Sequence, residues 1–217
     1  MEVIANLATS LDGKIATAHR EFFPLGTQTD WAQMIELRAT VDAVIFGAAT
    51  LRAFRGFCGA PKDSPSQPAN VVMSSKLEGF SLQWPFFKEP TRKRILVVTS
   101  PITRKAASTF GSKADLVRLK PGPRLAIHLL KELKKRGMKR VLIEGGGSIM
   151  WEFARHNLID EYHVTLTPRI LGGAAAPTLV DGDGFNPKKV LNLKLIEARP
   201  IGDELYLLYR KTARRGA

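Results

Sequence analysis

The chain of 217 residues has 44% hydrophobic and 24% charged residues, a composition typical of an ordinary soluble globular protein. No apolar run reaches the length of a membrane span, and the amino terminus lacks the basic-then-apolar order of a signal peptide. A single cysteine, Cys58, excludes an internal disulfide framework, so we expect one cytoplasmic domain over residues 1–217.

The formal net charge of +13 predicts anionic partners, and both nucleic acid and phosphorylated small molecules fit that charge. The basic residues are dispersed, with short clusters at 92–94, 134–136 and 214–215, and no aromatic-rich recognition strand accompanies them. The charge therefore favours phosphate-bearing small molecules over nucleic acid. Four scattered histidines and one cysteine give no spacing typical of a metal site, so no metal is expected.

Strands and helices alternate along most of the chain. Apolar patterns predict strands at residues 3–9, 42–46, 71–74, 94–99, 115–119, 139–144, 162–168, 191–198 and 204–210. Helices are predicted at 29–41 with Thr29 as N-cap, from 47 onward, from Pro101 onward, from 125 to a stop at Gly137, and from 145 to about 157. Residues 56–70 are predicted to form a loop, and 79–91 to be irregular. This order predicts an α/β fold: a mixed, mostly parallel sheet with helices on both faces and a carboxyl-terminal antiparallel hairpin.

The strand Val141-Leu142-Ile143-Glu144 runs into Gly145-Gly146-Gly147, and Ser148-Ile149 then opens a helical pattern. Glycines allow a sharp turn and a close approach of the backbone to a ligand, and free N–H groups at a helix start can hold an anion. The pattern predicts a phosphate or dinucleotide cradle, although it is not the longer G-x-G-x-x-G motif. A tight strand-to-helix turn without a ligand remains the alternative. The Glu144 carboxylate at the strand end favours a site.

Arg38 interrupts an apolar pattern. On a helical wheel it falls near the middle of an arc formed by Trp31, Met34, Ile35, Leu37 and Val41. A guanidinium among core-facing side chains needs an anionic partner or an opening to solvent. It either extends its charged end to solvent at the helix end or reaches into an active-site cleft to hold a carboxylate or phosphate.

Asp12 and Lys14 follow the first strand, separated by Gly13. An Asp-Gly pair is common in hairpin turns, but an Asp and a Lys at a strand end can also exchange protons with a substrate.

Two further strand-to-helix junctions, ending at Thr50 and at Ser100, offer free N–H groups and hydroxyls for an extended dinucleotide. Arg104 and Lys105 follow Ser100 and could meet the 2′-phosphate of NADP, or they could be ordinary solvated helix surface.

The chain also shows a family resemblance. The motifs that carry it, in order, are Ser10-Leu11-Asp12-Gly13-Lys14-Ile15-Ala16, Leu37-Arg38-Ala39 with Asp42-Ala43 and Thr50, Leu142-Ile143-Glu144-Gly145-Gly146-Gly147, Leu158-Ile159-Asp160-Glu161, Thr165-Leu166-Thr167-Pro168 and Leu171-Gly172-Gly173. The chain resembles the reductase domain of riboflavin biosynthesis, which occurs alone or fused behind a deaminase domain. That domain has the dihydrofolate reductase fold.

The resemblance implies an NADPH-dependent reductase that converts the ring-opened ribose of 5-amino-6-(5-phosphoribosylamino)uracil to ribityl by hydride transfer to C1′, and it suggests a homodimer. By motif, the residues implied at the cofactor are Ala8, Thr50, Ser100 and 146–152, with the glycine turn Gly145, Gly146, Gly147, Ser148 and Ile149 as the cradle. Arg38 and Glu144 are implied at the substrate, and Asp12 and Lys14 beside the reacting centre together with Glu144.

The chain departs from the family in two places. Phe22-Phe23-Pro24-Leu25 stands where the family usually has a Ser and a Trp, and residues 53–58 replace a run that helps to hold the substrate phosphate. Pocket contacts set specificity, so a same-fold reductase acting on a dihydropterin or dihydrofolate remains an alternative. A non-catalytic nucleotide- or nucleic-acid-binding protein is another, although pure binding does not need the Glu144 carboxylate.

Overall fold

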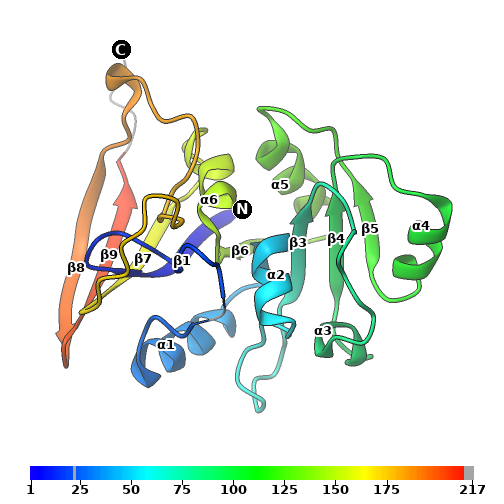
Figure 1. Cartoon of the computed structure of the whole chain (residues 1–217), viewed down its shortest axis with the longest axis horizontal. Coiled ribbons are helices and arrows are strands. Elements are labelled where there is room, and N and C mark those ends of the chain that lie inside the picture. The colour runs from blue at the N-terminus through cyan, green and yellow to red at the C-terminus, as the bar shows by residue number, and fades with distance from the viewer. Residues whose placement is uncertain (22, 213–217) are drawn as a thin grey trace.

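A nine-stranded sheet runs through residues 1–21 and 23–212, which are the residues that the computed structural model describes (Figure 1). Its strands are β1 (Glu2–Ser10), β2 (Ala43–Gly47), β3 (Ala69–Ser74), β4 (Arg94–Val98), β5 (Asp115–Arg118), β6 (Arg140–Ile143), β7 (Glu161–Thr167), β8 (Leu193–Ile201) and β9 (Glu204–Lys211). The helices are α1 (Gln28–Arg38), α2 (Ala48–Phe54), α3 (Pro85–Lys88), α4 (Arg104–Gly111), α5 (Leu125–Lys135) and α6 (Gly147–Ala154), with a 3₁₀ turn at Pro187–Lys189.

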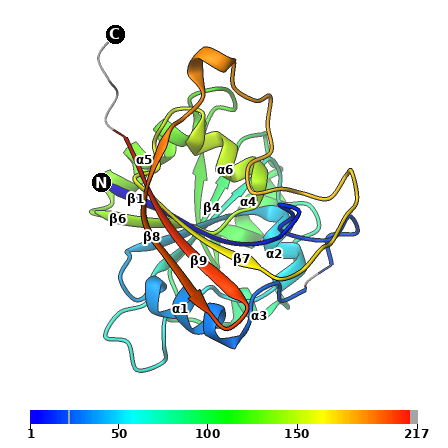
Figure 2. The same ribbon diagram turned by 90° about the vertical axis from the view of Figure 1, so that its left-hand side faces the viewer.

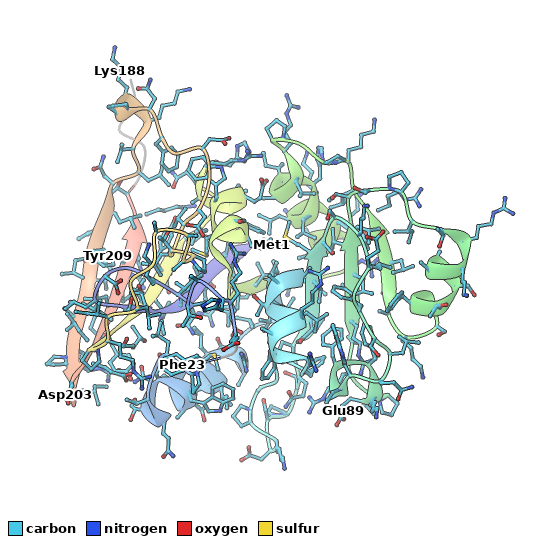
Figure 3. The ribbon with its side chains drawn as sticks, in the orientation of Figure 1. Met1, Phe23, Glu89, Lys188, Asp203 and Tyr209 are labelled. Atoms are coloured by element: carbon cyan, nitrogen blue, oxygen red, sulfur yellow. The ribbon has the colours of Figure 1, made fainter. Side chains whose placement is uncertain are left out.

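The strands lie in the order β5-β4-β3-β2-β6-β1-β7-β9-β8. All neighbours from β5 to β7 are parallel, and β9 and β8 complete the sheet as an antiparallel hairpin beside β7. Figure 2 shows these last strands crossing the front of the molecule, and Asp203 marks the hairpin tip in Figure 3. The first strand therefore lies inside the sheet, where Ile4 faces Leu142 of β6 and Leu7 faces Val164 of β7.

Helices cover both faces of the sheet and create two apolar cores. On one face α5 and α6 contribute Leu129, Leu133 and Phe153, all fully buried. On the other face α2 contributes Leu51 and α3 contributes Phe86. Burial on both faces explains why strands such as β2 are continuous apolar runs rather than alternating ones.

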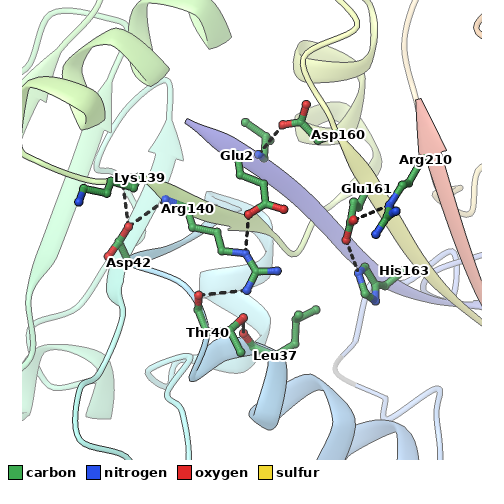
Figure 4. Close-up of polar contacts among 11 residues, drawn as sticks. Glu2, Leu37, Thr40, Asp42, Lys139, Arg140, Asp160, Glu161, His163 and Arg210 are labelled. Atoms are coloured by element: carbon green, nitrogen blue, oxygen red, sulfur yellow. Dashed lines mark hydrogen bonds and ion pairs between the residues drawn. The ribbon is translucent and has the colours of Figure 1, made fainter. Parts of the chain in front are cut away.

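Polar contacts fix the amino ends of the central strands (Figure 4). The Asp42 carboxylate accepts hydrogen bonds from the N–H groups of Lys139 and Arg140, at 2.7 and 2.8 Å. The Arg140 guanidinium in turn pairs with Glu2 at 2.8 Å. These contacts join the start of β1 to the starts of β2 and β6, so the site must form at the opposite, carboxyl edge of the sheet.

The mixed sheet, its two-sided helical cover and the terminal hairpin confirm the predicted fold. Three local predictions are wrong. Helix α1 has Thr27 rather than Thr29 as its N-cap, and the helix expected at Pro101 begins at Arg104, where the Thr103 hydroxyl accepts from the N–H of Ala106. Residues 79–91 contain the short helix α3, because its two phenylalanines enter the core.

Phe22 and residues 213–217, including the Arg214-Arg215 cluster, lie outside the described residues. The single domain over 1–217 therefore stays a prediction. None of the described helices has the length and apolar character needed to cross a membrane. Nor do three His, Cys, Asp or Glu side chains gather, within that part of the chain, where they could hold a metal ion.

Candidate active site

A cleft of about 710 Å³ opens at the carboxyl ends of β1, β2 and β6. Its lining combines residues 6–8 of β1, residues 47–50 at the β2–α2 junction, Glu144 and residues 146–149 at the β6–α6 junction, and Trp31, Met34 and Arg38 of α1. Residues 20–21 and 23–28 form a further part of the wall. Open parallel sheets place their ligands at this edge, because loops after the strands converge there.

Two helices begin at the cleft without a side-chain cap. Gly47 is the N-cap of α2 and Gly146 that of α6, and glycine has no side chain to accept from the first N–H groups. These N–H groups have no partner within their helices, so they are available to an anion. The two junctions are tied together, since the N–H of Gly47 donates to the carbonyl oxygen of Gly145 at 3.0 Å.

Each glycine of the turn meets a different constraint. Gly145 has φ +95°, a conformation that favours glycine, and the peptide bond between Gly145 and Gly146 is cis. Gly146 has φ −71°, and a Cβ there would lie 3.8 Å from Ile15, an ordinary contact. A Cβ on Gly147 would lie 2.4 Å from a carboxylate oxygen of Asp181 and 2.5 Å from the carbonyl oxygen of Thr178. The positive φ that favours glycine therefore belongs to Gly145 and not to Gly146.

Arg38 and Glu144 form a buried ion pair on the cleft wall. The Arg38 Nε and Nη2 atoms donate to the two carboxylate oxygens of Glu144, both at 2.7 Å, and Arg38 is only 5% exposed. Burial alone would lower the pKa of Arg38, but the charge and hydrogen bonds of Glu144 outweigh it and raise the pKa above its ordinary value. The solvent-directed alternative for Arg38 is thus wrong. A contact with substrate stays a prediction, since its main partner is a side chain of the protein.

Sequence reasoning missed a second support for Glu144. Asn70, fully buried in β3, accepts from the N–H of Cys58 at 2.8 Å and donates to the Cys58 carbonyl oxygen at 2.9 Å. This pairing holds the Cys58 thiol against the Arg38–Glu144 pair, where burial and then the negative charge of Glu144 raise the pKa of the thiol. The signal in the sequence was an asparagine inside an otherwise apolar strand.

The wall formed by residues 23–28 is anchored from the carboxyl-terminal hairpin. Glu204, 2% exposed at the start of β9, accepts from the N–H of Thr27 at 2.7 Å and from its hydroxyl at 2.6 Å. The Tyr206 hydroxyl donates to the same carboxylate at 2.6 Å. Thr27 therefore starts α1 in place of Thr29, because its position is set by a residue far along the chain.

The predicted residues separate into two groups. Ala8, Thr50, Gly146, Gly147, Ser148, Ile149, Arg38 and Glu144 line the cleft. Asp12, Lys14, Ser100 and Gly145 lie outside the described lining, Gly145 directly beside it. The Lys14 ammonium donates to the carbonyl oxygen of Ala176 at 3.4 Å. The N–H of Ser100 donates to the carbonyl oxygen of Ser75 at 3.0 Å. The catalytic and cofactor roles of these outer residues stay predictions.

Asp12 instead holds the loop after β7. Its carboxylate accepts from the Ser10 hydroxyl at 2.6 Å and from the N–H groups of Leu171 and Gly172 at 3.1 and 2.7 Å. The hydrogen bond from the Ser10 hydroxyl contributes most to the shift, and the one from the Leu171 N–H contributes next. Together they lower the pKa of Asp12 to about 2. Since this folded-state pKa is below the unfolded value of about 3.9, the contact stabilises the loop above pH ~3.9 and is lost as the pH falls through about 2.

We expect the amide proton shifts of Leu171 and Gly172, followed by NMR during acidification, to move with a midpoint near the lowered pKa of Asp12. Asp12→Ala should remove this titration and give the shifts of the released loop at every pH, because no carboxylate remains to accept from the two amides. The N–H of Arg169, which donates to the Thr167 carbonyl oxygen, is the internal control. Unchanged Leu171 and Gly172 shifts in Asp12→Ala would show that the loop does not depend on this carboxylate.

Comparison with known proteins places the chain in a family. The sequence profile of the RibD C-terminal domain matches residues 1–207. The 2,5-diamino-6-ribosylamino-4(3H)-pyrimidinone 5′-phosphate reductase of Methanothermobacter thermautotrophicus is 30% identical over 217 residues, covering 95% of this chain and 96% of that protein. The reductase of the same name from Aquifex aeolicus is 28% identical and covers 89% and 88%.

Solved structures agree in fold. A pyrimidine reductase-like protein from Corynebacterium diphtheriae has a TM-score of 0.80 at 20% identity, covering 98% of this chain and 92% of that one. RibD from Acinetobacter baumannii has a TM-score of 0.78 at 22% identity, and the match covers 98% of this chain and 58% of that one. The profile and the relatives confirm the resemblance seen in the motifs. The chain therefore belongs to the RibD C-terminal domain family, the reductases of riboflavin biosynthesis.

Proposed function

We propose that the protein uses NADPH to reduce the ring-opened ribose of a 5-phosphoribosylaminopyrimidine to ribityl, by hydride transfer to C1′. The substrate that the sequence motifs favour is 5-amino-6-(5-phosphoribosylamino)uracil. The observation that carries the proposal is a cleft with two uncapped helix starts beside a buried carboxylate, at the carboxyl edge of a family-typical sheet. That arrangement suits a phosphate-bearing cofactor on one side and a polar heterocycle on the other.

The residues at the two junctions fit a dinucleotide. The N–H groups that follow Gly47 and Gly146 can donate to pyrophosphate oxygens, the Thr50 hydroxyl adds a donor, and Ala8 leaves room for a flat ring. When bound, NADPH supplies the hydride. We assign the extended remainder of the cofactor, including its 2′-phosphate, to the carboxyl end of β4 near Ser100, Arg104 and Lys105.

Glu144 orients the substrate in this proposal. Its two oxygens accept from Arg38 and keep further lone pairs that can accept hydrogen bonds from a ligand. A ring N–H or amino group of the pyrimidine is the donor that such a carboxylate selects. The family resemblance assigns proton transfer at the reacting centre to Asp12 and Lys14. The contacts of Asp12 do not add support for this role, because its carboxylate already accepts from two backbone amides.

Two pyrimidines compete as substrate. The Methanothermobacter and Aquifex relatives are named for the 2,5-diamino compound, whereas a related structure from Thermotoga maritima is named for the uracil. Steady-state assays with NADPH and each pyrimidine, with dihydrofolate as the third substrate, test the proposal. We expect turnover of a phosphoribosylaminopyrimidine in preference to dihydrofolate. Turnover of dihydrofolate alone, or no binding of NADPH, would contradict it.

We expect NADPH to bind more tightly than NADH, because Arg104 and Lys105 can pair with the 2′-phosphate. Titration of both cofactors by fluorescence gives the two dissociation constants. Substitution of both cations by glutamine should bring the NADPH affinity down to that of NADH. Lys134→Gln, which changes an exposed lysine at the carboxyl end of α5, should change neither affinity. Equal affinities in the unsubstituted protein would remove the support for a 2′-phosphate contact.

The proposal includes a cytoplasmic homodimer that binds no nucleic acid. Its basis in the structure is the edge strand β8, where Leu193 and Leu195 are 36% and 48% exposed and lie on one face with Tyr209 of β9. Unpaired, apolar edges are usually covered in stable proteins. Sedimentation velocity of the purified protein measures the dimer, and a monomer at working concentration would contradict this part of the proposal.

A further inference from the structure

The cleft has far less positive charge than the net charge of the chain suggests. The charged residues among its described lining are the cations Arg20 and Arg38 and the carboxylates Glu21, Asp30, Glu144 and Asp181. Much of the remaining wall is apolar, with Phe23, Trp31 and Phe54 among its side chains. A phosphate monoester that enters this cleft must find a cation, because a dianion is not stable against an apolar and acidic surface.

Arg38, Glu144 and Asp181 already have partners within the protein. Arg38 is bound by both oxygens of Glu144. The Asp181 carboxylate accepts from the Thr178 N–H at 3.1 Å and from the Thr178 hydroxyl at 2.6 Å. Arg38 is therefore neutralised before a ligand arrives, and it cannot turn to a phosphate without leaving Glu144 unpaired and buried.

The segment of residues 53–58 does not supply the missing cation. Its arginine, Arg55, lies with its guanidinium 5.7 Å from the ring centre of Trp84 and donates through Nε to the carbonyl oxygen of Arg52. Arg55 is not part of the described cleft lining. Phe57 packs against the buried core on the α2 and α3 side of the sheet.

Arg20 is the cation that remains. It is exposed, lines the cleft, and has a φ of +56°, held by its N–H to the carbonyl oxygen of Thr17 at 2.9 Å. Its guanidinium has no hydrogen-bond or ion-pair partner among the described residues. The segment that carries it is fixed on both sides, by Ile15 to the Pro177 carbonyl oxygen at 2.9 Å and by Thr27 to Glu204.

We propose that Arg20 binds the 5′-phosphate of the substrate, and that it is the cation that makes the enzyme select a phosphorylated pyrimidine. The guanidinium presents parallel N–H donors that match two phosphate oxygens. This inference rests on the proposed function for the identity of the ligand, but not for the existence of a phosphate site. Because the 2′-phosphate of NADPH is also a phosphate monoester, the experiment must separate the two sources.

The first measurement needs no turnover. Ribose 5-phosphate and ribose are titrated into the unsubstituted protein, Arg20→Gln, Arg20→Lys and the charge-matched control Lys134→Gln, with calorimetry as the readout. Arg20→Gln should weaken binding of ribose 5-phosphate about tenfold or more, the scale of a hydrogen bond to a charged group. Arg20→Lys should retain part of the affinity and Lys134→Gln all of it, and the affinity for ribose should be the same in all four proteins.

The second measurement uses steady-state kinetics with the phosphorylated pyrimidine and its dephosphorylated nucleoside. Arg20→Gln should raise KM for the phosphorylated substrate about tenfold or more and leave KM for the nucleoside and the kcat values unchanged. Equal KM values for the phosphorylated substrate in both proteins would overturn the inference. So would a loss confined to NADPH affinity with NADH unaffected, because that result places the cofactor phosphate at Arg20.

The outcomes also separate this inference from the proposed function. If no pyrimidine is reduced but ribose 5-phosphate binding still depends on Arg20, the function is wrong and the phosphate site stands. If the pyrimidine is reduced and Arg20→Gln changes nothing, the function stands and the site is wrong. Circular dichroism and a thermal melt of each variant verify that the fold is retained.

Discussion

Arg38→Met is expected to lower the free energy of unfolding by about 3–5 kcal/mol, the cost of leaving a buried charge without its partner. Methionine fills the space on the helix face, so the loss comes from Glu144, whose side chain is only 8% exposed and would have no counter-charge. For a chain of this size the melting temperature should fall by roughly 6–20 °C. Chemical denaturation and a thermal melt measure both quantities.

Two variants show that burial is the cause. Arg136 pairs with Asp115 at the same 2.7 Å, but the two side chains are 31% and 66% exposed, so Arg136→Met should cost less than about 1 kcal/mol. Adding Glu144→Gln to Arg38→Met removes the orphan charge and should restore much of the lost stability. An Arg38→Met protein as stable as the Arg136→Met protein would mean that water or another cation reaches Glu144.

Gly147→Ala is expected to cost about 1–3 kcal/mol and to weaken cofactor binding, because the new methyl group has no room. Its Cβ would lie 2.5 Å from the backbone carbonyl oxygen of Thr178, which cannot rotate away as a flexible side chain can. The segment from Thr178 to Asp181 must therefore move, and Asp181 is part of the cleft wall. Denaturant unfolding and an NADPH titration measure the two effects.

The neighbouring Gly146→Ala is the matched control. At φ −71° and with 3.8 Å to Ile15, alanine fits without strain, so folding stability should stay within about 1 kcal/mol. Any loss of NADPH affinity in Gly146→Ala then reports how closely the cofactor approaches the backbone. Equal stability of the two variants would show that the Thr178 segment yields freely, and the packing argument for Gly147 would be wrong.

The sequence identified Arg38 and Glu144 as residues of interest but not as partners. Local pattern reveals an arginine on an apolar helix face and a carboxylate at a strand end, yet 106 positions separate them. Their pairing follows from β6 lying between β2 and β1, an order that no local signal contains. The strands themselves were predictable, because burial on both faces produces continuous apolar runs.

The start of α1 was mispredicted for a related reason. Thr29 followed by Asp30 satisfies the local rules for a helix start, but Thr27 is fixed by Glu204, which comes 177 positions later. Asp12 and Ser100 follow strand ends, but a strand end alone does not determine which side chains reach the cleft. The family motifs identified most of the lining residues. The roles of Asn70 and Arg20 follow only from their neighbours in the folded structure, Cys58 for Asn70 and the cleft for Arg20.

The interior position of β1 has a consequence for how the protein is made. Residues 2–10 are synthesised long before both neighbours of this strand, because β6 and β7 follow only after residue 139. The contact between Thr27 and Glu204 requires nearly the whole chain. Strand β1 must therefore stay unpaired while residues 11–139 are synthesised, since its partners in the sheet do not yet exist. The cleft is completed among the last events of synthesis, and a ribosome stalled before the hairpin carries a protein that has no finished binding site.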